Sequence, residues 1–284
     1  MADPSLEVDA LRTAAPLPPL LVEARQLAGA ALQGRHGRRR SGIGEDFWQF
    51  RRYQTGDSAQ AIDWRQSAKS DALFLREREW SAAETILLWP DPSASMRWRS
   101  APTLPEKRHR AAVLGLAAAV LLLEAGERVC LLGDRPVSGV TALPRLTGAI
   151  LEQPVASAMP SGPLSRRGQV LLLSDFLEPP ETLYAAVKSI AGSGLKGHLV
   201  HVIDPAEEAL PGQGRMRYQG LEGEGEVTVA RAESLAADYG QRWRVHCDGL
   251  RDLARSLGWS YLAHRTDRPP IDALAALHGA LSGR

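Results

Sequence analysis

Residues 85–95, "TILLWPDPSAS", join an apolar run to a short series of polar side chains. The run from Thr85 to Pro90 lacks any two-residue alternation of apolar and polar residues, which predicts a strand buried on both faces of a sheet. Asp91, Ser93 and Ser95 follow at intervals of two, so their side chains can point the same way from an extended loop. The stretch therefore predicts a buried parallel strand that ends in three oxygen-bearing side chains.

Apolar runs of the same kind recur along the chain and alternate with helical segments. They read "RVCLLG" at 128–133, "QVLLLSD" at 169–175, "HLVHVID" at 198–204 and "WSYLAH" at 259–264. The helices are expected at about 105–125, 180–191 and 231–257. This alternation is typical of a doubly wound, Rossmann-like α/β domain, in which helices cover both faces of a mostly parallel sheet.

The sequence predicts three parts of the chain. Residues 1–33 contain a Pro-rich stretch and are expected to form a flexible tail. Residues 34–83 form a small block with some β structure, which we expect to pack on the main domain because little linker separates the two. Residues 84–284 form the α/β domain, with a Gly-rich loop and a hairpin inserted near 206–230.

Composition and charge exclude several functional classes. The formal net charge is +1, which argues against a general electrostatic grip on nucleic acid or membrane. The most apolar stretch, 111–123, is too short to span a bilayer and suits a buried helix. Cys130 and Cys247 lie in apolar surroundings at no metal-ligand spacing, which indicates reduced thiols. We therefore expect a cytoplasmic protein without a membrane span.

Four predicted strands end in an aspartate: Asp91, Asp134, Asp175 and Asp204. In open parallel sheets, ligands bind beyond the carboxyl ends of the strands. Each aspartate alone is better explained by capping of a helix or by a turn than by a ligand. The Asp-x-Ser-x-Ser spacing after the first strand favours a ligand there, because one carboxylate and two hydroxyls are hard oxygen donors of the kind that Mg²⁺ prefers.

The "DPSAS" motif at 91–95, together with "LLLSDF" at 171–176, resembles the metal-ion-dependent adhesion site (MIDAS) of von Willebrand factor A domains. The resemblance implies that Asp91, Ser93, Ser95 and Asp175 hold Mg²⁺, or Mn²⁺, and that a partner's carboxylate completes the site. A threonine from a second loop belongs to the motif. Thr141 is preferred to Thr147 for this role because it precedes the helix expected near Pro144. The Gly that often follows the third-motif Asp is Phe176 here.

The block upstream carries a second resemblance. The segment "FWQFRRYQTGDSAQAIDWRQSAK", residues 47–69, resembles the signature of the domain of unknown function 58 family. The matching residues are Phe47, Arg51, Tyr53, Gly56, Asp57, Ile62, Asp63, Trp64, Ala68 and Lys69. The resemblance implies a bacterial protein of the short form without membrane helices. It also implies a MoxR-type AAA+ ATPase as a partner, with a client protein that the sequence does not identify.

Two interpretations of this block stay open. Arg51 and Arg52 precede the predicted turn at 55–57, and Asp63 follows it, so the charges can form an Arg–carboxylate lock inside a small core. The same residues can instead present a surface to a partner. The arginines in "RHGRRR", residues 35–40, are expected in a solvated loop and not on nucleic acid.

Two functions from different classes fit these observations. The first is a non-catalytic protein-binding module with a Mg²⁺ site of the adhesion type. The alternative is a Mg²⁺-dependent phosphotransfer enzyme or hydrolase that uses the acidic strand ends. A phosphoaspartate enzyme of the haloacid dehalogenase type needs an aspartate where Ser93 stands. The sequence shows no nucleophile elbow and no Walker loop, so the first function is preferred and no catalytic residue is expected.

Overall fold

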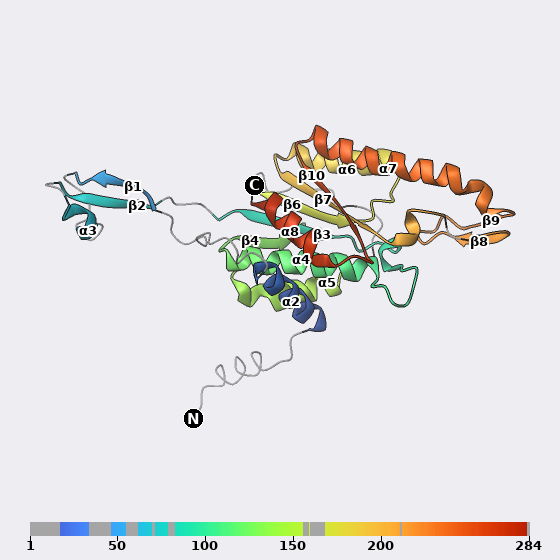
Figure 1. Ribbon diagram of the computed structural model, residues 1–284, viewed down its shortest axis with the longest axis horizontal. Helices are drawn as coiled ribbons and strands as arrows, with labels where there is room; N and C mark the ends of the chain where they lie inside the picture. Colours follow the sequence, from blue (N-terminus) through green and yellow to red (C-terminus); the bar gives the residue numbers. More distant parts are fainter. Residues whose placement is uncertain are drawn as a thin grey trace, which may run out of the picture. The chain divides into compact units, whose positions relative to one another are not determined.

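The computed structural model describes most of the chain (Figure 1). The described residues are 18–33, 47–54, 62–69, 72–78, 83–155, 159, 168–210 and 212–282. The chain divides into two compact units, one of residues 37–83 and one of residues 1–36 and 84–284. Each unit is described by itself, beginning with the larger.

A six-stranded sheet forms the centre of the larger unit, in the order β10-β7-β6-β3-β4-β5. The strands are β3 (Thr85–Pro90), β4 (Arg128–Leu131), β5 (Val137–Ser138), β6 (Gln169–Ser174), β7 (Lys196–Ile203) and β10 (Ser260–Arg265). All neighbouring pairs are parallel except β4 with the short edge strand β5. The predicted doubly wound, mostly parallel α/β architecture is confirmed.

The strands are apolar along their whole length because each face of the sheet meets its own layer of helices. Leu88 of β3 belongs to the core that includes residues of α2 (Pro19–Gln33), α4 (Lys107–Glu124), α5 (Leu143–Leu151) and α8 (Pro270–Leu281). Leu87 belongs to the core on the other face, with residues of α6 (Pro180–Gly192) and α7 (Ala236–Ser256). The two helical layers lie on opposite sides of the sheet in Figure 1. Successive side chains of a strand point to opposite faces, so each strand contributes to two cores.

The predicted flexible tail at 1–33 is wrong for its second half. Residues 19–33 form α2, which contacts α4, α8 and α5. Leu20, Leu21, Ala24 and Ala28 are buried there, at spacings that place them on one stripe of the helix. Pro19 occupies the first helical position, where its missing N–H leaves no hydrogen bond unmade. The prolines mark the start of a helix and not an unstructured segment.

The smaller unit contains an antiparallel pair of strands and a short helix. β1 (Phe47–Arg52) pairs with β2 (Phe74–Arg78), and α3 (Trp64–Ser67) lies between them in the sequence. Asp63 caps α3 by accepting a hydrogen bond from Gln66 N at 2.9 Å. The predicted turn residues Gly56 and Asp57 lie outside the described residues. Packing of this block on the main domain stays a prediction.

The strand order changes direction at β3, and this change fixes where a ligand can bind. From β3 the chain crosses to β4 on one side and later returns to β6 on the other side of β3. The loops after β3 and β6 therefore diverge at the carboxyl edge, which is the usual ligand position in such sheets.

A hairpin of β8 (Met216–Gln219) and β9 (Glu226–Val229) lies within the stretch predicted as an insertion. No helix among the described residues has the length and apolar character needed to cross a membrane.

Candidate functional site

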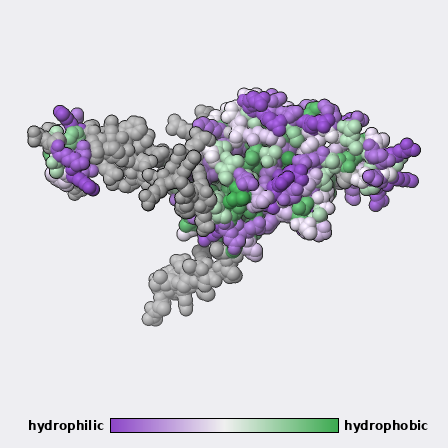
Figure 2. Space-filling model, in the orientation of Figure 1, coloured by the Kyte–Doolittle hydropathy of each residue, from purple (hydrophilic) through white to green (hydrophobic). Residues whose placement is uncertain are grey.

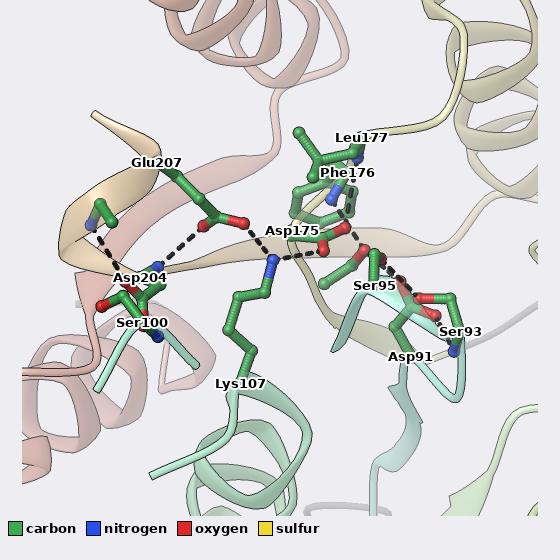
Figure 3. Close-up of polar contacts among 12 residues, drawn as sticks. Asp91, Ser93, Ser95, Ser100, Lys107, Asp175, Phe176, Leu177, Asp204 and Glu207 are labelled. Carbon is green, nitrogen blue, oxygen red and sulfur yellow. Dashed lines mark hydrogen bonds and ion pairs between the residues drawn. The ribbon is translucent and has the colours of Figure 1, made fainter. Parts of the chain in front are cut away.

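The loops that follow β3 and β6 bring four predicted site residues to one place (Figure 3). Asp91, Ser93, Ser95 and Asp175 are all buried. Asp91 N donates to Leu173 O at 2.9 Å, which continues the ladder between the two strands up to the site. The hydroxyls of Ser93 and Ser95 lie 3.1 Å apart. The two-residue spacing thus produces the predicted group of oxygen atoms.

The carboxylate of Asp91 is held by hydrogen bonds within these two loops. Its Oδ1 accepts from Ser93 N at 2.8 Å, and its Oδ2 accepts from the hydroxyl of Ser174. No lysine or arginine of the described residues forms an ion pair with it. Burial raises the pKa of Asp91 to about 6, and the charge of Asp175 adds to this effect. Asp91 is therefore a buried acid whose charge has no partner in the described structure.

Thr141, the predicted threonine ligand, lies exposed in a 3₁₀ turn at 140–142, before α5. Thr147 is buried in α5, and its hydroxyl donates to Leu143 O at 2.8 Å, which is a bond within the helix. Within the described part of the chain, neither threonine joins the hydrogen bonds around Asp91. The role of Thr141 stays a prediction, and Thr147 has a structural explanation.

Lys107 adds a cation that the sequence did not predict. It lies in the first turn of α4 with its side chain 1% exposed, and its Nζ donates to Asp175 Oδ2 at 2.7 Å and to Glu207. Figure 3 shows Lys107 between Asp175 and Glu207. Burial opposes the charged form of Lys107, but the two carboxylates outweigh burial and the pKa is raised. Asp175 is therefore neutralised from within the protein, whereas Asp91 is not.

The composition of the chain contains one signal that could have marked Lys107 as a site residue. Only four of the 34 Lys and Arg residues are lysines, so a lysine is unusual in this chain. A buried position between two carboxylates suits a compact ammonium, which can direct its donors separately, better than a planar guanidinium. Lys107 also stands at the start of a helix, where the macrodipole disfavours a positive charge, so its carboxylate partners are needed to hold it there.

Two further glutamates border the site, and sequence motifs do not mark either one. Burial raises the pKa of Glu178 to about 7, and the nearby charges of Asp91, Asp175 and Glu222 contribute. Its Oε2 is buried and has no hydrogen-bond partner among the described residues. Glu222 comes from the β8–β9 hairpin, and its Oε1 accepts from Ser95 N at 2.9 Å. Acidic groups from three separate segments of the chain thus gather around the serines.

Of the other two strand-end aspartates, Asp134 is exposed and Asp204 caps a turn. Asp134 is exposed in a turn, where its N–H donates to Leu131 O at 2.9 Å. Asp204 begins the 3₁₀ turn at 205–207 and forms a capping box with Glu207. Its Oδ2 also accepts from Ser100 N at 2.9 Å. The carboxylate of Asp204 therefore needs no ligand to explain it.

Phe176 has a backbone conformation that favours glycine. Its φ is 52°, the only positive φ of a non-glycine among the described residues. The ring is buried and meets His201 edge-on at 6.0 Å between centroids. Phe176 N donates to Ser174 Oγ at 2.8 Å, so the strained turn also fixes the hydroxyl that binds Asp91. Phe176 thus adopts the backbone turn that glycine favours, and its ring adds a contact to the core.

The donor set fits a hard divalent cation with incomplete protein coordination. Among the described residues, no three His, Cys, Asp or Glu side chains are arranged to share one metal ion. A cation beside Asp91 would therefore depend on the serine hydroxyls and water as well as on carboxylate. Mg²⁺ commonly keeps several waters in such sites.

Comparison with known proteins places this site in a family context. The chain is 26% identical to the uncharacterized protein Rv1480 of Mycobacterium tuberculosis and, to the same degree, to the uncharacterized protein Mb1516 of Mycobacterium bovis. Both comparisons cover 92% of this chain and 87% of the relative. A conserved hypothetical protein BatB from Bacteroides thetaiotaomicron is 13% identical, with a TM-score of 0.40 over 72% of this chain and all of that chain. The family model "Protein of unknown function DUF58" matches residues 49–248. This match spans more than half of the chain, so the protein belongs to the DUF58 family.

Proposed function

We propose that the protein is a non-catalytic binding module that presents Mg²⁺, or Mn²⁺, to a carboxylate of another protein. The observation that carries the proposal is the buried carboxylate of Asp91. It lies beside two serine hydroxyls, and no described cation pairs with it. A divalent ion at this position supplies the missing charge.

The distribution of charge supports this assignment. Lys107 contacts Asp175 and Glu207, so one ammonium already serves two carboxylates. Asp91 and Glu178 lie beyond these contacts, and burial raises the pKa of both. A divalent cation near Asp91 would favour the ionised form of each acid, because an opposite charge within a few ångströms lowers a carboxyl pKa.

The expected coordination leaves room for a partner. We expect Asp91, Ser93 and Ser95 to contact the ion, with water in the remaining positions. Asp175 has one oxygen committed to Lys107, so we place it in a supporting position. With one charged ligand and two neutral hydroxyls, the ion stays electron-poor and attracts an acidic oxygen from outside. This is the logic of the von Willebrand A-type adhesion site that the motif resembles.

The enzyme alternative has less support. A Mg²⁺-dependent enzyme needs a nucleophile or a general base beside the ion, and Lys107 is held by two carboxylates. The hydroxyl of Ser174 is bonded to Asp91, and we find no lysine or histidine base on it among the described contacts. We therefore assign the acidic edge to binding.

We propose a MoxR-type AAA+ ATPase as the partner, acting with a client protein in the assembly or maturation of a complex in the cytoplasm. This part of the proposal rests on the resemblance of residues 47–69 to the family signature. A pull-down from the source organism, with and without a chelator, checks it. Loss of the ATPase on chelation supports a metal-dependent contact.

Calorimetric titration with Mn²⁺ tests the metal site. Wild type and Asp134→Ala should bind Mn²⁺ with the same weak affinity, because Asp134 is a strand-end aspartate outside the site. Asp91→Ala should show no binding, since it removes the charged ligand. Equal heats for all three proteins would mean that the Asp-x-Ser-x-Ser segment is only a turn.

A further inference from the structure

The β8–β9 hairpin reaches the candidate site through one side chain. Glu222 lies in the connection between β8 and β9, and its carboxylate accepts a hydrogen bond from Ser95 N at 2.9 Å. The two residues are 127 positions apart in the sequence. The inserted hairpin thus places its own carboxylate on the loop where a cation is proposed to bind.

Glu222 adds a further negative charge beside the buried acids of the site. Burial is the main cause of the raised pKa of Glu178, and the charges of Asp91 and Glu222 raise it further. Glu222 is itself exposed, so water reaches its side chain beside this hydrogen bond. The hydrogen bond from Ser95 N offsets part of the repulsion between Glu222 and the other acids. A divalent ion between these carboxylates would attract them all.

The β8–β9 hairpin is short and presents the side chain of Glu222 at its turn. Glu222 N donates to Glu224 Oε2 at 2.9 Å, and Gly220 N donates to Gly225 O at 2.8 Å, which shapes the turn. The strands have four residues each, and Val227 is 61% exposed. A two-stranded hairpin of this length is marginally stable. Hydrophilic residues cover much of this end of the molecule in Figure 2, as expected for an element bordered by water.

We propose that Glu222 is an internal ligand that occupies the position of the partner's carboxylate. The hairpin then covers the site at rest, and an acidic side chain of the partner displaces it. This inference rests on the proposed function, because the shared position is a coordination position on the cation. It names the partner group as an Asp or Glu side chain.

Hydrogen exchange of residues 216–229 tests the inference, with Mn²⁺ as the cation and acetate as the carboxylate probe. Adding Mn²⁺ to wild type should slow exchange in the hairpin on the order of tenfold, because Glu222 gains a charged partner. Acetate should reverse this protection, and acetamide, its neutral analogue, should not. Glu222→Gln should show no protection by Mn²⁺. Glu226→Gln, which removes a hairpin carboxylate that pairs with Arg217, should keep the protection by Mn²⁺.

The outcomes separate this inference from the proposed function. If calorimetry shows Mn²⁺ bound at Asp91 and hairpin exchange does not change, the internal-ligand inference is wrong and the metal site stands. Protection that persists in Glu222→Gln, or that acetate does not reverse, also overturns it. If Mn²⁺ does not bind at all, the proposed function and this inference both fail.

Discussion

At the scale of single residues, Asp91 is kept in a position that disfavours its charge. Burial raises its pKa from 3.8 to about 6, so its folded pKa lies above its unfolded value. Its contribution to stability is therefore fully present below about pH 4 and is lost as the pH rises through 6. The buried charge of Asp91 therefore does not stabilise the fold at neutral pH, and a bound cation would offset its cost.

This reasoning gives a first prediction. Asp91→Asn should be more stable than wild type at pH 8 in a chelator, by on the order of 1–3 kcal/mol, because the isosteric amide carries no charge to bury. The gain should shrink toward pH 4. Thermal denaturation at both pH values, with EDTA present, measures it. A variant less stable than wild type at pH 8 would contradict the interpretation.

Lys107 gives a second prediction. Lys107→Met removes the ammonium between Asp175 and Glu207 and leaves two buried carboxylates unpaired, which should reduce the free energy of unfolding by about 3–5 kcal/mol. Lys188→Met, which changes an exposed lysine on α6, should stay within about 0.5 kcal/mol of wild type. Urea denaturation compares the three proteins. A loss below 1 kcal/mol in Lys107→Met would show that the ion pairs are not important.

The sequence predicted only part of this site. The sequence marks Asp91, Ser93 and Ser95, because local spacing controls where their side chains point. It marks Asp175 because this residue ends a recognisable strand. Lys107 and Glu222 meet their partners across 68 and 127 residues, so no local pattern marks them. Glu178 is perturbed by burial, which depends on tertiary packing.

At the scale of elements, apolar patterning predicted the sheet well and the N-terminal helix poorly. The run "TILLWP" coincides with β3, because a strand buried on both faces is apolar at every position. Helix α2 was missed because its prolines suggest a tail, although its buried residues follow helical spacing. Its contacts with α4 and α8 make it part of the core.

The role of α2 gives a third prediction. Leu21→Ala should reduce the free energy of unfolding by about 2–5 kcal/mol, because Leu21 is fully buried in the core that α2 shares with α4. Val22→Ala changes the neighbouring exposed position and should have an effect within about 0.5 kcal/mol. Urea denaturation with a common slope measures both. Equal effects would mean that α2 does not pack on the domain in solution.

At the scale of the whole molecule, buried histidines should control acid stability. Burial is the main cause that lowers the pKa of His198 to about 4, of His201 to about 3 and of His264 to about 4. Each folded pKa lies below the unfolded value of about 6.5, so the unfolded state binds more protons below that pH. Stability from these groups is present above pH 6.5 and is lost as the pH falls.

The fourth prediction follows from these three histidines. The free energy of unfolding should decrease between pH 7 and pH 5, even though Asp91 and Glu178 act in the opposite direction. Urea titrations at half-unit steps of pH give the slope. His198→Gln should flatten the slope, because it removes one proton acceptor of the unfolded state. A stability that is constant or rises toward pH 5 would contradict the assignment of neutral buried imidazoles.

The central claim is that a divalent cation binds beside Asp91, and crystallography with Mn²⁺ tests it most directly. Crystals grown with Mn²⁺ should show an anomalous peak about 2.1 Å from the Asp91 carboxylate and from the hydroxyls of Ser93 and Ser95. The same map shows whether Glu222 or water fills the remaining positions. The account predicts this peak in wild type and none in Asp91→Ala. A wild-type map without a peak there, with Asp91 still bonded to Ser93 and Ser174, would contradict it.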